Sequence, residues 1–144
     1  MAVVSFAQVR QAIKTKVETV AGFKLVPLPP SYFRRIQNTI AHKGFTVDMP
    51  TSSDEGERMR RGITYLSSTA RVIFAYRLRP KDIITDYDLC MDSEEDIINV
   101  VLGIYADIRD GIQIRYNRST RDVPDSMEYM VTTIEFTILH TITN

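Results

Sequence analysis

The sequence predicts an α+β fold: a single domain, residues 1–144, in which helices pack on one face of a mostly antiparallel β-sheet. Two long segments, at about 63–79 and 127–143, alternate apolar and polar residues with the period of two that is typical of strands. Two other segments repeat apolar residues every three or four positions, as amphipathic helices do. The 144 residues, 44% of them hydrophobic, are enough for one hydrophobic core.

The first third of the chain predicts two helices joined by an extended connector. Val9, Ile13, Val17 and Val20 recur at helical spacing and predict an amphipathic helix that ends near Gly22. Ser5 can cap its N-terminus. Three prolines in 23–30 exclude helix there and predict extended chain. A short helix is expected over 31–44, followed by a short strand at 45–47.

The middle of the chain predicts a loop, a long strand and a second amphipathic helix. In 49–62, seven of fourteen residues are charged or proline, which indicates a long exposed loop. The strand at 63–79 has one apolar face and an opposite face with Arg71, Arg77 and Arg79. Ser93 is the expected N-cap of the following helix, while 82–92 fits either a separate turn or an extension of that helix.

The last part of the chain predicts two more strands. Residues 112–116 alternate as a strand does, 117–126 are polar and predict a loop, and 127–143 predict the final long strand.

The formal net charge is zero, but the two parts of the chain carry opposite charges. Residues 1–80 have 13 basic and 5 acidic side chains, whereas residues 81–144 have 5 basic and 13 acidic ones. Such a division indicates a polar interaction surface. Either the two sets neutralise each other within one fold, or the positive face of one copy meets the negative face of the next.

No metal, cofactor or catalytic site is predicted. Asp86, Asp88 and Asp92 suggest the start of a calcium loop, but Cys90 and Met91 stand where that loop needs an acidic residue and a glycine. Cys90 is the only cysteine and the two histidines are far apart in sequence, which gives zinc little support. The glycines stand singly and no nucleophile elbow is present, so we expect a protein that is not an enzyme.

Two stretches resemble the tail terminator proteins of tailed bacteriophages. In that family a basic strand passes through an R-x-R-P-x-D-like turn into a D-Y-D…D-x-E-E-like helix. This chain has Arg77 to Asp82 as the turn, and Asp86-Tyr87-Asp88 followed by Asp92-Ser93-Glu94-Glu95 as the helix. The closing strand, Ile134 to His140, is similar as well, so that the resemblance covers about half of the chain.

The resemblance implies a structural virion protein of the tail-neck region, assembled in the host cytoplasm. It would form a ring, typically hexameric, that caps the tail tube and joins it to the head-side connector, and would also meet the sheath where the tail is contractile. DNA would be passing cargo only, no cofactor would be needed, and no membrane would be contacted. A ring requires a heterologous interface that closes.

Two sets of residues are candidates for these contacts. We expect the acidic helix of one subunit to face the arginine-bearing strand of its neighbour, and the loop at 49–62 to contact the tube or connector. The subunit-interface candidates are Arg71, Arg77, Arg79, Asp86, Asp88, Asp92, Glu94 and Glu95. The loop candidates are Asp54, Glu55, Glu57, Arg58, Arg60 and Arg61.

Two other functions fit the same sequence. Another head–tail connector or completion ring would have a similar composition. A small nucleic-acid-binding regulator could use the arginines of the loop and strand for phosphate contacts, and it would bind DNA with a steep dependence on salt.

Overall fold

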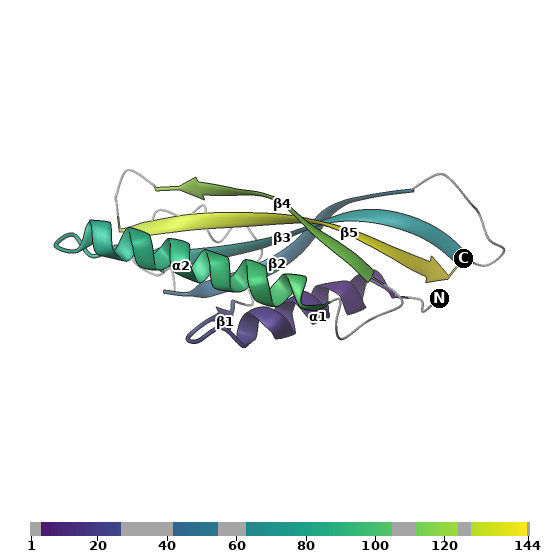
Figure 1. Cartoon of the computed structure of the whole chain (residues 1–144), viewed down its shortest axis with the longest axis horizontal. Coiled ribbons are helices and arrows are strands. Elements are labelled where there is room, and N and C mark those ends of the chain that lie inside the picture. Colours follow the sequence, from purple (N-terminus) through teal and green to yellow (C-terminus); the bar gives the residue numbers. More distant parts are fainter. Residues whose placement is uncertain (1–3, 27–41, 55–62, 105–111, 124–127, 144) are drawn as a thin grey trace.

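A computed structural model describes residues 4–26, 42–54, 63–104, 112–123 and 128–143, and it confirms the α+β prediction. Two helices pack against one five-stranded, mostly antiparallel sheet (Figure 1). The elements in chain order are α1 (Phe6–Glu18), β1 (Lys24–Leu25), β2 (Gly44–Asp54), β3 (Ile63–Arg77), α2 (Ile83–Leu102), β4 (Ile112–Asp122) and β5 (Tyr129–Thr143).

The sheet has the strand order β1-β2-β3-β5-β4, with β1 parallel to β2 and all other neighbours antiparallel. The two long strands, β3 and β5, pair without a register shift from Ile63 opposite Thr143 to Arg77 opposite Tyr129. Bulges interrupt the outer pairings, between Asp48 and Thr51 in β2 and between Tyr116 and Arg118 in β4. The two strands with alternating sequence, β3 and β5, therefore form the longest continuous pairing of the sheet.

Helix α1 begins at a complete capping box. The Ser5 hydroxyl accepts the Gln8 N–H at 3.2 Å, and the Gln8 side chain accepts the Ser5 N–H at 2.8 Å. Val9, Ile13 and Val17 are fully buried, as their spacing predicts. The chain turns back at Gly22, whose φ of 85° favours glycine.

Helix α2 starts eleven residues earlier than the capping pattern predicts. Its N-cap is Asp82 and it begins at Ile83, so that 83–92 belongs to the helix and the expected N-cap at Ser93 is wrong. The reason is that two carboxylates are buried in phase with the apolar stripe of the helix. The buried face consists of Asp86, Cys90, Glu94, Ile97 and Val101.

The core lies between the helices and the inner face of the sheet. Its largest buried side chains on the strands include Phe45, Phe74, Phe136 and Met130. Phe23, which follows α1, contacts Phe74 edge-to-face with ring centroids 5.3 Å apart. A smaller cluster on the outer face of the sheet buries Ile73 and Ala75.

Two predicted loops are partly wrong, because polar residues continue the strands. Residues 49–54 of the expected 49–62 loop extend β2, and 117–122 of the expected 117–126 loop extend β4. The expected connector at 23–30 contains β1. Most of the expected short helix over 31–44 lies outside the described residues; within them, Gly44 already belongs to β2.

None of the helices in the described part of the chain is long and apolar enough to cross a membrane.

Candidate subunit interface

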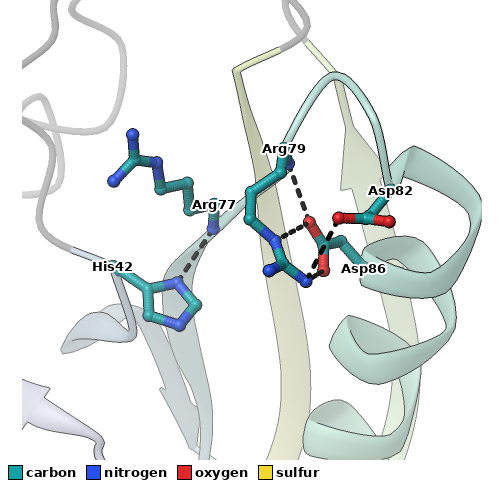
Figure 2. Close-up of polar contacts among 5 residues, drawn as sticks. All are labelled: His42, Arg77, Arg79, Asp82 and Asp86. Carbon is teal, nitrogen blue, oxygen red and sulfur yellow. Dashed lines mark hydrogen bonds and ion pairs between the residues drawn. The ribbon is translucent and has the colours of Figure 1, made fainter.

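The turn from β3 into α2 is closed by a buried carboxylate. Asp86 accepts the backbone N–H of Arg79 at 2.7 Å, and the Arg79 guanidinium donates to both Asp86 oxygens, at 3.1 and 3.0 Å (Figure 2). Asp82 lies 3.8 Å from the same guanidinium. The side-chain and backbone hydrogen bonds from Arg79 hold the pKa of Asp86 below its ordinary value. Arg79 and Asp86 of the R-x-R-P-x-D…D-Y-D stretch thus link the turn after β3 to the first turn of α2.

His42 lies beside this turn. Its Nδ1 accepts the Arg77 N–H at 3.0 Å (Figure 2). Its ring meets that of Tyr76 edge-to-face, with ring centroids 4.6 Å apart. Burial lowers the pKa of His42, as do the nearby charges of Lys43 and Arg77. A neutral ring is consistent with its role as acceptor for the Arg77 N–H.

A second buried carboxylate ties the middle of α2 to the edge strand β4. Glu94 is 3% exposed and accepts two hydrogen bonds from Arg121, at 2.9 and 2.5 Å. This contact raises the pKa of Arg121 further. Tyr87 on α2 and Tyr116 on β4 are partly exposed on the same two elements.

The outer face of the sheet holds an alternating row of charges. Asp48, Arg71, Glu135 and Arg118 lie opposite one another on β2, β3, β5 and β4. Arg71 donates to both oxygens of Asp48, at 2.9 and 2.5 Å, and Arg118 lies 3.3 Å from Glu135. Opposite charges on neighbouring strands support the sheet register.

The structure divides the eight predicted interface residues into two groups. Arg71, Arg79, Asp86 and Glu94 have charged partners within the chain, as in the intramolecular alternative. The side chains of the other four are exposed and have no ion pair with a described residue: Arg77, Asp88, Asp92 and Glu95.

The predicted tube-contacting loop is reached by the structure only at its start. Asp54 is the last residue of β2 and is exposed. Glu55, Glu57, Arg58, Arg60 and Arg61 lie outside the described residues.

Sequence reasoning missed a buried polar chain near the end of β5. Nδ1 of His140 lies 2.9 Å from the Val4 carbonyl oxygen, and its Nε2 lies 2.8 Å from the Ser68 hydroxyl, which is 2.8 Å from that of Ser52. A carbonyl only accepts, so Nδ1 donates to Val4, and Nε2 of a neutral ring accepts from Ser68. The available signal was that Ser68 and His140 are in phase with the buried residues of their strands.

The described residues contain no cluster of three or more His, Cys, Asp or Glu that could hold a metal ion. Cys90 is buried, and this burial raises the pKa of its thiol to about 11. No protein-family model and no curated protein sequence matches the chain.

Proposed function

We propose that this protein is a ring-forming structural component of the bacteriophage tail neck, a tail terminator that caps the tail tube and joins it to the head-side connector. The observation that carries the proposal is the segment 71–95, where the resemblance is densest. In the fold it is one strand–turn–helix unit, closed by Arg79 and Asp86. Two of the motif residues thus join the start of α2 to the turn that precedes it.

The surface of α2 supports a role in contact with other proteins. Its helix carries six carboxylates and no basic residue, and four of these are exposed: Asp88, Asp92, Glu95 and Asp96. Like charges three or four residues apart destabilise a helix by about 0.2–0.5 kcal/mol per pair. A basic partner surface would relieve this repulsion, as in an interface between subunits.

Electron microscopy of the purified chain, alone and mixed with tail tubes, tests the proposal. We expect closed rings, six-fold by the family resemblance, at the ends of the tubes. Rings that bind connectors but not tubes would favour another neck protein. A chain that binds duplex DNA with a steep salt dependence and leaves tubes uncapped would instead be a nucleic-acid-binding regulator.

A further inference from the structure

The molecule has two chemically different sides. Helix α1 packs along β1 and β2 at one edge of the sheet, and α2 packs over β5 and β4 at the other (Figure 1). The α1 side consists of residues 4–26 and 42–47, which include the start of β2, and the α2 side consists of α2 and β4. The Arg10 side chain donates to the Val47 carbonyl at 2.8 Å, which fixes α1 along the β2 edge.

The two sides carry opposite charge. Residues 4–26 and 42–47 hold five basic side chains and one acidic, Glu18, which pairs with Lys14 at 3.3 Å. On the α2 side, Arg118 and Arg121 are already paired with Glu135 and Glu94. The four exposed carboxylates of α2 therefore outweigh Arg115, the remaining arginine of β4.

The α2 side also carries most of the exposed apolar surface. Among the described residues, six of the seven exposed large hydrophobic side chains lie on α2, on β4 or directly after β4: Ile84, Tyr87, Leu89, Leu102, Tyr116 and Val123. Ile84 is the most exposed, at 80%. Tyrosine is also one of the residue types enriched among the side chains that contribute most to binding energy in protein interfaces.

We infer that the α2 side of one copy docks against the α1 side of the next copy. This inference rests on the proposed ring and specifies its contact. The two surfaces differ, so the contact is heterologous, and repeating it generates a ring if the rotation closes. It replaces the expected contact between the acidic helix and the arginine-bearing strand, because Arg71 and Arg79 are paired within the chain.

Side chains, rather than strand pairing, make this contact. The open part of the β2 edge contains Pro50, which has no N–H to donate, and a bulge adjoins it. β4, the strand at the opposite edge of the sheet, also has a bulge, at Asn117. The apolar residues of the α2 side supply affinity, and the opposite charges set the register and exclude other arrangements.

Reciprocal charge reversal tests the inference on the full chain. The first variant is Asp88→Lys with Glu95→Lys on the α2 side, and the second is Lys24→Glu on the α1 side. The control is Arg77→Glu at the end of β3, outside both of these sides. Ring formation is measured by size-exclusion chromatography with light scattering and by electron microscopy on tail tubes, after circular dichroism has established that each variant is folded.

Each of the first two variants should need at least roughly tenfold more protein than the parent to form rings, which corresponds to a loss of about 1.4 kcal/mol per contact. A mixture of the two should assemble again, because each altered side then meets an oppositely charged one. The control should assemble like the parent. If the control alone fails, the inference is wrong and the ring function stands. If the parent forms no rings with or without tubes, the proposed function fails and the inference fails with it.

Discussion

Two regions bury polar groups in different ways. The α2 attachment, made by Asp86–Arg79 and Glu94–Arg121, places carboxylates under the helix and neutralises each with an arginine. The terminal region, where the N-terminal segment meets the end of β5, uses the neutral chain from Val4 through His140 to Ser68 and Ser52. The end of β5 lies at the opposite end of the sheet from the turn into α2 (Figure 1).

The difference is one of cost and of response to pH. A buried charge that loses its partner costs several kcal/mol, whereas a buried neutral group that loses one hydrogen bond costs about 1–3 kcal/mol. The α2 attachment should therefore be the more sensitive region to substitution, and it should also weaken in acid. Five substitutions, three in these regions and two that serve as comparisons, can test this contrast.

The largest effect is expected for Arg121→Ala. It leaves Glu94 buried without its cation, and since the Arg121 side chain is itself 33% exposed, we expect a loss of about 2–3 kcal/mol in the free energy of unfolding. Urea unfolding followed by circular dichroism measures it. A loss below about 1 kcal/mol would show that water replaces the arginine at little cost.

A smaller loss is expected for Asp86→Asn, because the amide oxygen can still accept the Arg79 N–H. The informative readout is pH. The folded pKa of Asp86 lies below its ordinary 3.8, so its contribution is full above about pH 4 and is lost as pH falls through the folded value. The parent should therefore lose stability more steeply than the variant below pH 4. If the stability of the parent and that of the variant fall in parallel with pH, Asp86 does not contribute to the acid sensitivity.

The same contrast explains which parts of the fold were predictable from sequence. Strands β3 and β5 lie inside the sheet, and each turns one face into the core. Their alternation of apolar and polar residues was therefore visible from Ile63 and from Tyr129 onward. The ends of β2 and β4 were missed because Thr51 to Asp54 and Asn117 to Asp122 are polar on both faces, and edge strands need no apolar alternation.

The two ion pairs that attach α2 were not predicted from the sequence, because their carboxylates are buried. Asp86 and Glu94 are among the residues expected at the subunit interface, although they fall in phase with Cys90, Ile97 and Val101. A carboxylate in an apolar stripe indicates a buried ion pair, but the spacing of residues along the helix does not identify the basic partner. Arg79 is seven residues from Asp86, whereas Arg121 is 27 residues from Glu94 and reaches it only through the pairing of β4 with β5.

In the terminal region, Ser68→Ala tests the neutral chain. It removes the hydroxyl that donates to His140 and leaves Nε2 buried without a donor, for which we expect a loss of about 1–2 kcal/mol. Ser52→Ala is the matched control, since Ser52 is exposed and water can replace it, at a cost of about 0–0.5 kcal/mol. Equal losses in the two variants would mean that the chain acts as a unit up to the surface.

The smallest effect is expected for Arg118→Ala, which is the matched comparison for Arg121→Ala on the same strand. Arg118 also pairs with a glutamate, but its side chain is 73% exposed and that of Glu135 is 22% exposed, so both groups keep much of their hydration. We expect a change of about 0–0.5 kcal/mol, and less in high salt. Burial of the acid, rather than the presence of an ion pair, would then account for the difference between the two arginines. If both substitutions cost the same, the distinction between the α2 attachment and the outer face of the sheet has no energetic basis.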